Sequence, residues 1–232
     1  MPIFQLTRDV RFPHPELAEE NGLLAIGGDL SPERLLSAYS RGIFPWFAEG
    51  DPILWWFTSP RLILFPDEFR ISKRLARYLR NSQVQITRDC AFRQVIRSCA
   101  TVRTEAGDNT WITPAMQAAY MELHDLGFAH SIECWHQNQL VGGLYGIALD
   151  RVFFGESMFS RIHCGSQFAL IELVHFLKSE NYKLIDCQMT TNHLLRFGAR
   201  EISGKEFQSL LKENIRDIKP HENWKSSNII EK

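Results

Sequence analysis

The N-terminal part of the chain alternates short apolar runs with turn-forming residues, and one helix stands out among them. Ser31 can cap this helix, Pro32 suits its first turn, and Gly42 can end it. Aromatic residues follow over 43–57, but prolines interrupt them, so we expect loops or short strands there. These features predict a small N-terminal domain over residues 1–62.

Helical spacing of apolar residues dominates the stretch that follows. Residues 71–80 place apolar side chains on one face and basic side chains on the other, and residues 89–99 repeat the helical pattern. Thr113-Pro114 is typical of a helix start, and Gly127 is typical of a helix end. Three helices are therefore expected before the pattern changes.

Beyond residue 130 the apolar positions change to the period of β-strands. The expected elements are strands at 131–135, 139–148 and 152–156, a helix at 165–180, a strand at 183–188 and a short helix at 192–197. This order indicates an antiparallel meander joined to a crossover, the arrangement of acetyltransferase-type folds. We therefore predict an α+β fold with a GNAT-type mixed sheet and flanking helices over residues 63–232. Gly142-Gly143 in the second strand indicates a bulge or a close backbone approach.

Composition places the chain among ordinary globular proteins. Its 232 residues are 44% apolar and carry a net charge of −1, so any nucleic-acid site has to be a local patch. Five cysteines without a C-x-x-C pair indicate free thiols in a reducing compartment, and the eight histidines lack the spacing of zinc ligands. Because the N-terminus has no signal peptide and no run reaches membrane-spanning length, we expect a cytoplasmic protein.

A basic stripe is the candidate for such a patch. Lys73, Arg74, Arg77 and Arg80 recur at three- and four-residue steps on one predicted helix, and no acidic residue occurs from 69 to 88. A stripe of one sign is suited to the phosphates of a nucleic acid, and we assign it to tRNA binding. The same pattern also fits a solvated helix face, so both interpretations stay open.

Polar side chains gather in two segments that contain or follow apolar runs. Residues 154–160 combine Glu156 with two serines, and residues 184–188 place Asp186 and Gln188 after an apolar pair. If that pair belongs to a strand, alternation directs Asp186 and Gln188 to the same face. A buried carboxylate needs a hydrogen-bonding partner or a catalytic role, and the local sequence alone favours a hydrogen-bonded strand end.

Six motifs in a fixed order carry a family resemblance. They are Asn21–Leu30, Arg41–Trp46, Pro52–Trp56, Thr110–Thr113, Gly155–Ser160 and Ile185–Gln188. Together they resemble the leucyl/phenylalanyl-tRNA–protein transferases over about residues 3–224. The resemblance implies an enzyme that moves Leu or Phe, and less readily Met, from aminoacyl-tRNA to the N-terminal Arg or Lys of a protein, which marks that protein for bacterial N-end-rule degradation. It implies no metal or coenzyme, and we expect a monomer without membrane contact.

The resemblance also implies roles for individual residues. The implied catalytic residues are Glu156, Asp186 and Gln188. The implied substrate-binding residues are Trp46 and Trp111 for the terminal adenosine, Leu144, Met158, Leu170 and Ile185 for the amino-acid pocket, and in addition Tyr39 and Ser157. Two positions depart from the family pattern. Leu144 replaces a methionine, and Gln167 replaces a lysine, which puts a phosphate contact from position 167 in doubt.

Attack of the acceptor amine on the donor ester requires accurate positioning of the two groups more than a strong base. The donor is an activated ester, and an α-amine has a pKa of about 7.7–8.0, so a useful fraction of the acceptor is free base at neutral pH. Asp186 is suited to accepting the amine proton or holding the charged intermediate. Gln188 is suited to orienting the amine and Glu156 to holding polar groups of the substrate. Which carboxylate reads the cationic side chain of the acceptor stays open.

Two other functions also fit some of these residues. An acyl-coenzyme A N-acyltransferase of the same fold class needs a Gln/Arg-x-x-Gly-x-Gly/Ala loop before the long helix, and the residues around Gly165 do not match it. An RNA-binding module would use the basic stripe and the tryptophans, but it leaves Glu156, Asp186 and Gln188 without a role. Incubation with charged tRNA and a peptide acceptor, and then with acetyl-coenzyme A, separates the three functions.

Overall fold

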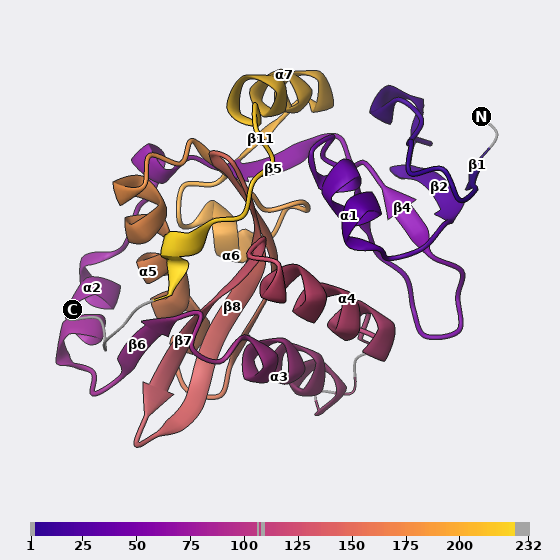
Figure 1. Cartoon of the computed structure of the whole chain (residues 1–232). Helices are drawn as coiled ribbons and strands as arrows, with labels where there is room; N and C mark the ends of the chain where they lie inside the picture. The colour runs from indigo at the N-terminus through magenta and orange to yellow at the C-terminus, as the bar shows by residue number, and fades with distance from the viewer. Residues whose placement is uncertain (1–2, 106, 108–109, 226–232) are drawn as a thin grey trace.

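The N-terminal part forms a small sheet of its own. The computed structural model describes residues 3–105, 107 and 110–225 (Figure 1). Four short strands pair in the order β1-β2-β4-β3: β1 Phe4–Leu6, β2 Leu23–Gly27, β3 Phe44–Pro45 and β4 Leu54–Trp56. Helix α1 (Pro32–Tyr39) begins directly after Ser31, and Gly42 follows it with a φ of 75°. The predicted helix and its predicted end are thus confirmed.

A seven-stranded mixed sheet forms the rest of the β-structure. Its strands are β5 Arg61–Leu64, β6 Gln85–Arg88, β7 Ala129–His136, β8 Gln139–Leu149, β9 Val152–Ser160, β10 Leu184–Asp186 and β11 Arg200–Ile202. They lie in the order β11-β5-β10-β9-β8-β7-β6. β9 and β10 are parallel, and every other neighbouring pair is antiparallel. The predicted meander is β7-β8-β9, and the α+β class is confirmed.

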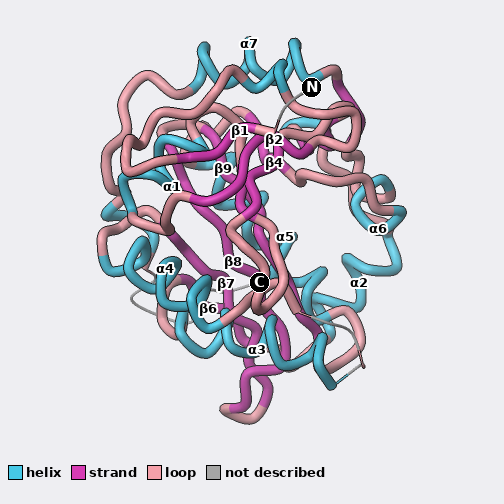
Figure 2. Tube along the Cα trace, turned by 90° about the vertical axis from the view of Figure 1, so that its right-hand side faces the viewer, coloured by secondary structure: helices cyan, strands magenta, loops and turns pink. Residues whose placement is uncertain are grey.

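Helices cover both faces of the large sheet. They are α2 Lys73–Asn81, α3 Phe92–Glu105, α4 Pro114–Asp125, α5 Gly165–Ser179, α6 Asn192–Leu195 and α7 Gly204–Asn214, with short 3-10 helices at Pro15–Leu17, Pro66–Glu68 and Glu222–Trp224. α3 and α4 pack on one face of β7, β8 and β9, and α5 packs on the other as the crossover to β10 (Figure 1). After a quarter turn, α7 crosses one end of the molecule, and α2 and α6 lie along one side (Figure 2).

Alternation along the strands divides the buried side chains into two cores. Leu144 and Phe153 pack with α5, whereas Tyr145 and Phe154, each one residue later, pack on the α3 and α4 side. The core on the α3 and α4 side also contains Trp55 and other residues of the N-terminal sheet. The two sheets therefore share one core, and the junction between them is buried.

Several elements were not predicted from the sequence, among them β5, β6, β11 and α7. Strands β5, β6 and β11 have only three or four residues each, too few for alternation to be detected. Helix α7 had a usable signal, because Ser203 caps it by accepting from the backbone N–H of Glu206 in an S-x-x-E pattern. The predicted domain boundary at residue 62 lies inside β5.

The glycine pair in β8 reflects a close backbone approach. A Cβ atom at Gly142 would lie 2.6 Å from the carbonyl carbon of Gly165, so the backbones of β8 and α5 touch there. A bulge also lies directly beside the pair, because Cys134 pairs with Gly142 and Trp135 with Leu140, which leaves Val141 as the extra residue of β8. A second irregularity in the β8 ladders lies at 145–146. The contact fixes the first turn of α5 against the sheet, and α5 forms one wall of the cavity described below.

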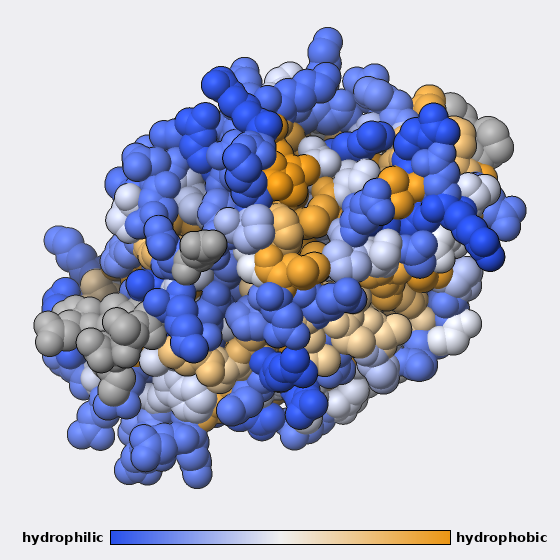
Figure 3. All heavy atoms as spheres, in the orientation of Figure 1, coloured by the Kyte–Doolittle hydropathy of each residue, from blue (hydrophilic) through white to orange (hydrophobic). Residues whose placement is uncertain are grey.

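Apolar side chains also reach the surface. In the orientation of Figure 1, apolar residues gather in the middle of the visible face, and hydrophilic residues surround them (Figure 3). The large apolar side chains that are exposed include Trp46, Met189 and Leu195. Among the residues described, none of the helices combines the length and the apolar character that crossing a membrane requires.

Candidate active site

A bulge in β9 sets the direction of two polar side chains. In the ladder between β8 and β9, Gly146 pairs with Gly155 and Tyr145 pairs with Ser157, which leaves Glu156 without a partner on β8. Such a bulge bends its strand and redirects the side chains beside it. Glu156 is 9% exposed and Ser157 is 8% exposed. The strand thus presents a carboxyl group and a hydroxyl group in a position almost without water.

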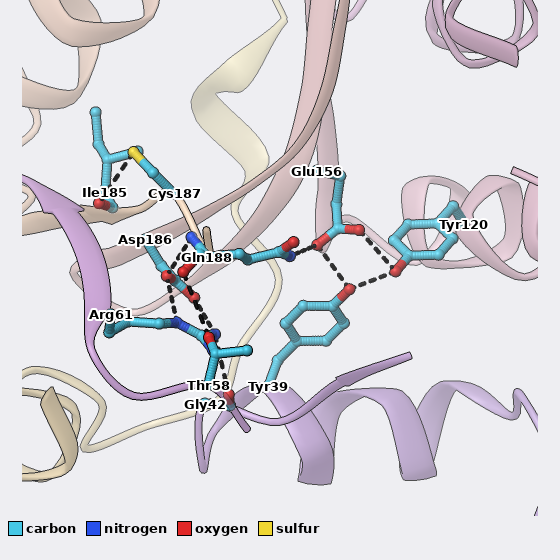
Figure 4. Close-up of polar contacts among 10 residues, drawn as sticks. All are labelled: Tyr39, Gly42, Thr58, Arg61, Tyr120, Glu156, Ile185, Asp186, Cys187 and Gln188. Atoms are coloured by element: carbon cyan, nitrogen blue, oxygen red, sulfur yellow. Dashed lines mark hydrogen bonds and ion pairs between the residues drawn. The ribbon is translucent and has the colours of Figure 1, made fainter. Parts of the chain in front are cut away.

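Two buried tyrosines hold the carboxyl group of Glu156 (Figure 4). The Tyr39 hydroxyl, from α1, lies 2.7 Å from Oε1, and the Tyr120 hydroxyl, from α4, lies 3.0 Å from Oε2. The two hydroxyl groups also hydrogen-bond each other. Gln188 completes the arrangement, because its Nε2 donates to Oε1 over 2.8 Å. Four distant parts of the chain therefore meet at one carboxyl group.

Burial raises the pKa of Glu156 to about 7. Desolvation is the largest cause, since it disfavours the charged form, and the negative charge of nearby Asp186 acts in the same direction. Hydrogen bonds from the two tyrosines and Gln188 act against this rise. Burial raises the pKa values of Tyr39 and Tyr120 well above the ordinary tyrosine value, and the charge of Glu156 adds to this. The tyrosines thus stay neutral around neutral pH, whereas Glu156 titrates there.

Gln188 links this carboxyl group to a second one. Its backbone N–H donates to Oδ1 of Asp186 over 2.9 Å, while its side chain donates to Glu156. Gln188 lies beyond the end of β10 and has a φ of 59°, in the left-handed region. The alternation that predicted a shared face for Asp186 and Gln188 therefore ends before Gln188. As a result, Gln188 lines the cavity described below, and Asp186 does not.

Arg61 pairs with Asp186 in the interior (Figure 4). Its Nε donates to Oδ1 over 2.8 Å and its Nη2 to Oδ2 over 2.7 Å, and both side chains are inaccessible to solvent. Arg61 also donates to the carbonyl oxygen of Gly42 over 3.0 Å and to the hydroxyl of Thr58 over 3.1 Å. Since both oxygens of Asp186 are engaged by Arg61, this carboxylate is better placed to hold Gln188 than to take a proton from a substrate.

Aromatic rings enclose the guanidinium group of Arg61. Its central carbon lies 4.8 Å from the ring centroids of both Phe44, in the N-terminal sheet, and Phe207, in α7. Arg61 was not predicted from the sequence as a site residue. The sequence did contain a signal, because Arg61 directly precedes the apolar run 62–64. A charged residue beside a buried strand needs a partner of opposite charge, so this position could have been identified.

A cavity of about 360 Å³ opens beside Glu156. Its wall is mostly apolar and includes all four residues predicted for the amino-acid pocket, Leu144, Met158, Leu170 and Ile185. Residues that were not predicted also line it, among them Phe153 and Leu173. Its polar edge is formed by Glu156, Ser157 and Gln188. An apolar cavity with a few convergent polar groups is typical of a small-ligand site.

Two tryptophans lie at this cavity. Trp46 is 40% exposed, and Trp56 holds it, since the indole N–H of Trp56 donates to the Trp46 carbonyl oxygen over 2.7 Å. Trp111 precedes α4 and packs, partly buried, against the core. A flat ligand ring can therefore contact indole surface here, because both side chains leave part of their surface accessible.

Two polar atoms at the cavity have no hydrogen-bond partner among the residues described. They are Oγ of Ser157 and Nε2 of His193, from α6. Burial also lowers the pKa of His193, which favours its neutral form. A buried polar atom without a partner costs roughly 1–3 kcal/mol, so each of these atoms would gain from a bound ligand.

The basic stripe lies on the surface of α2, outside the cavity. Its four side chains are exposed, and within the described part of the chain none of them forms a salt bridge. α2 packs on the start of α5, where the ring of Tyr78 contacts those of His163 and Phe168. The stripe is therefore connected to the cavity through α5, the helix that carries Leu170.

Most of the predicted site residues meet at the cavity. Those that line it are Trp46, Trp111, Leu144, Glu156, Ser157, Met158, Leu170, Ile185 and Gln188. Tyr39 and Asp186 lie behind its wall, where they contact Glu156 and Gln188 respectively. Tyr120 and His193 also belong to the site but were not predicted from the sequence. Tyr120 lies on the buried face of α4, where a tyrosine is usually a packing residue, so its position gave no signal.

Comparisons with known proteins cover almost the whole chain. A family model described as "Leucyl/phenylalanyl-tRNA protein transferase" matches residues 63–212, and the model of the N-terminal domain of the same family matches residues 28–59. The chain is 55% identical over 225 residues to a leucyl/phenylalanyl-tRNA–protein transferase of Desulfotalea psychrophila, covering 97% of this chain and 99% of the relative. It is 56% identical over 224 residues to the enzyme of that name in Syntrophobacter fumaroxidans, covering 97% and 96%.

Solved structures are similar at a much lower level. One is an aminoglycoside acetyltransferase from a soil metagenome, with a TM-score of 0.38 and 13% identity, covering 62% of this chain and 97% of that chain. Another is the C-terminal domain of a putative lysylphosphatidylglycerol synthetase of Agrobacterium fabrum, with a TM-score of 0.42 and 11% identity over 79% of this chain and 57% of that chain. The sequence matches, not these likenesses, decide the family: the chain belongs to the leucyl/phenylalanyl-tRNA–protein transferases and is an aminoacyltransferase.

Proposed function

We propose that this enzyme transfers Leu or Phe, and less readily Met, from aminoacyl-tRNA to the N-terminal Arg or Lys of an acceptor protein, which marks the acceptor for N-end-rule degradation. The observation that carries this proposal is one cavity with an apolar wall, two tryptophans and a polar edge. An aminoacyl-adenosine end has matching parts, namely an apolar side chain, a flat base and a polar ester. The setting is the cytoplasm, and the enzyme acts as a monomer.

The apolar wall supports a preference for apolar amino acids. Leu144, Leu170 and Ile185 are each at most 3% exposed and offer no hydrogen-bonding side-chain atoms. A polar or charged amino-acid side chain in this cavity would lose its hydrogen bonds to water without replacement, which costs roughly 2–7 kcal/mol per uncompensated polar group. The cavity therefore selects apolar amino acids in two ways. It excludes polar side chains, and each methylene group buried in it contributes about 0.8 kcal/mol to the free energy of binding.

The reaction exchanges an ester for an amide. The amine nitrogen of the acceptor attacks the ester carbonyl carbon, a C–N bond forms, the bond from that carbon to the ribose oxygen breaks, and the amine proton ends on the ribose oxygen. Gln188 is suited to orienting the amine, because its own orientation is set by Asp186 at the backbone and by Glu156 at the side chain. The unpaired hydroxyl of Ser157 is suited to donating to the carbonyl oxygen as negative charge develops on it.

A transfer assay tests the proposal. The purified enzyme is incubated with leucyl-tRNA and a labelled peptide that begins with Arg, and a matched peptide with an acetylated N-terminus serves as the control. We expect label in a Leu-Arg peptide and none in the control, because the acetylated nitrogen cannot attack. Transfer from acetyl-coenzyme A to the same peptide, with none from leucyl-tRNA, would contradict the proposal.

A further inference from the structure

The hydroxyl groups of Tyr39 and Tyr120 and the carboxyl group of Glu156 form a closed ring of contacts. Tyr39 contacts Oε1, Tyr120 contacts Oε2, and the two tyrosine hydroxyl groups contact each other (Figure 4). A ring with three hydrogen bonds needs three protons. The two tyrosines bring one proton each, because a phenolic hydroxyl has a single proton to donate.

The third proton has one available position, which is Glu156 itself. With a proton on Oε2, Glu156 donates to Tyr120, Tyr120 donates to Tyr39, and Tyr39 donates to Oε1. Each tyrosine then donates once and accepts once, and Oε1 also accepts from Gln188. With Glu156 ionised, both tyrosines donate to the carboxylate, and no proton is left between the two tyrosine oxygens. Two lone pairs would then face each other between two buried side chains, Tyr39 at 1% and Tyr120 at 0% exposure.

We infer that the free enzyme holds Glu156 as a neutral acid in this ring, and that a cationic group of the acceptor, docking at the cavity, releases the proton to solvent. The protons balance: the O–H bond of the carboxyl group breaks, its proton passes to solvent, and the new carboxylate faces the cation. No other covalent bond changes, and Tyr120 turns its own proton from Tyr39 to the carboxylate. The second half of the inference rests on the proposed acceptor, whereas the first half concerns the free protein alone.

The surroundings favour this resting state. Burial raises the pKa of Glu156 to about 7, and the tyrosines stay neutral. The other titratable groups nearby are Asp186, whose charge is paired with that of Arg61, and Tyr145 of β8, whose ring packs edge-on against Tyr120. The neighbouring cation is therefore already bound by another anion, and within the described part of the chain Glu156 has no positive partner of its own until a ligand supplies one.

A titration of the free enzyme tests the held proton. The side-chain carboxyl carbons of glutamate are labelled with ¹³C, and Glu156→Gln identifies the Glu156 signal. We expect this signal to titrate near neutral pH, while exposed glutamates in the same spectra titrate near their ordinary value of about 4.3. A Glu156 signal that titrates with the exposed glutamates would overturn the inference.

A calorimetric titration tests the release. An Arg-initiated dipeptide amide is added at about pH 6.5 in two buffers of different ionisation enthalpy, so that any proton release changes the measured heat. We expect release of up to about one proton per peptide bound by the parent, and by the control Glu122→Gln, an exposed glutamate on the same helix as Tyr120. We expect none by Glu156→Gln.

The two measurements can contradict the held proton and its release independently of each other. Binding without proton release by the parent would overturn the coupling. A near-neutral titration together with no peptide binding would support the held proton and remove the proposed acceptor. A low titration midpoint for Glu156 together with normal peptide binding would support the proposed acceptor and overturn the held proton.

Discussion

Two buried carboxyl groups of this enzyme are joined through one glutamine, Gln188, and they differ in the charge of their hydrogen-bonding partners. Asp186 faces a guanidinium group that gives it two hydrogen bonds. Glu156 faces two phenols and an amide, none of which carries charge. Both groups are almost inaccessible to solvent, so burial alone does not decide their state. The partner decides it: a cation holds the charge of Asp186, and its absence leaves Glu156 as a group that titrates near neutral pH.

The two carboxyl groups therefore have different roles in the site. Asp186 shapes the site through the backbone of Gln188 and does not reach the cavity. Glu156 lines the cavity and has a charge that can change during a reaction cycle. Asp186 therefore acts by holding Gln188 in place, whereas Glu156 can respond to a bound ligand.

Replacement of Asp186 by alanine is expected to have the largest effect. It leaves the guanidinium group of Arg61 buried without an anion, which typically costs about 3–5 kcal/mol of the free energy of unfolding. Transfer should also be lost, because the backbone N–H of Gln188 loses its acceptor. Urea unfolding and single-turnover transfer measure the two effects.

Asp67→Ala is the matched control for an ion pair. Asp67 pairs with Lys178 over 2.8 Å, and both side chains are mostly exposed. Its loss should change stability little, since exposed pairs contribute little. If Asp186→Ala proved as stable as Asp67→Ala, the buried pair would not hold the site together.

Glu156→Gln should reveal the other half of the comparison through pH. Below the ordinary carboxyl value of about 4.3, Glu156 is protonated in both the folded and the unfolded chain. As pH rises to about 7, the unfolded chain ionises first, so the free energy of unfolding of the parent falls. Glutamine mimics the neutral acid and removes this dependence. At about pH 8 we therefore expect the variant to be more stable than the parent by about 2–4 kcal/mol, and less active.

Chemical denaturation across the pH range measures this difference. The two proteins should converge in stability at low pH, where Glu156 of the parent is also neutral. A glutamine variant that is less stable than the parent at every pH would indicate that Glu156 is held as an anion, like Asp186.

Trp111→Ala is expected to have a smaller effect, and mainly on the donor. A lost stack on a base costs about 1–3 kcal/mol, or roughly a ten- to hundredfold rise in the KM for aminoacyl-tRNA, with the acceptor KM little changed. Trp111 also packs partly on the core, so some stability should be lost. A loss as large as the 3–5 kcal/mol typical of a core tryptophan, with normal donor binding, would exclude the stacking role.

How much the sequence could predict depends on the range of each signal. Local signals predicted the starts of α1 and α4 and the meander β7-β8-β9, because caps, turns and alternation lie within a few neighbouring residues. The direction of Gln188 was not predictable in this way. It depends on a left-handed backbone conformation that Asp186 stabilises after the strand has ended.

The partners of the two carboxyl groups were beyond local signals altogether. Tyr120 and Arg61 contact Glu156 and Asp186 across 36 and 125 positions of the chain. Neither carries a local pattern that distinguishes it from other buried or charged residues. The family resemblance singled out both carboxyl groups, but the different partners of the two follow only from the packing of α1, α4 and β5 around them.

Arg74→Glu combined with Arg77→Glu should have the smallest effect, on binding of tRNA alone. Each lost phosphate contact lowers the slope of log affinity against log salt by about 0.9, while a minimal aminoacyl-adenosine donor should be used normally. Lys205→Glu combined with Lys212→Glu, on exposed positions of α7, is the matched control. Equal salt slopes for the parent and the α2 variant would leave the stripe as a solvated helix face.

The pair of Arg61 and Asp186 also has a consequence for synthesis. Arg61 leaves the ribosome long before Asp186, since 125 positions separate them, and its other acceptors lie at Gly42 and Thr58. Until β10 is made, Arg61 lacks the carboxylate of Asp186 with which it pairs. Contacts over such a separation form late, because closing a long loop has a high entropic cost. A nascent chain therefore cannot complete its active site before β10 has been made, and a chain that stops short of β10 is expected to be inactive.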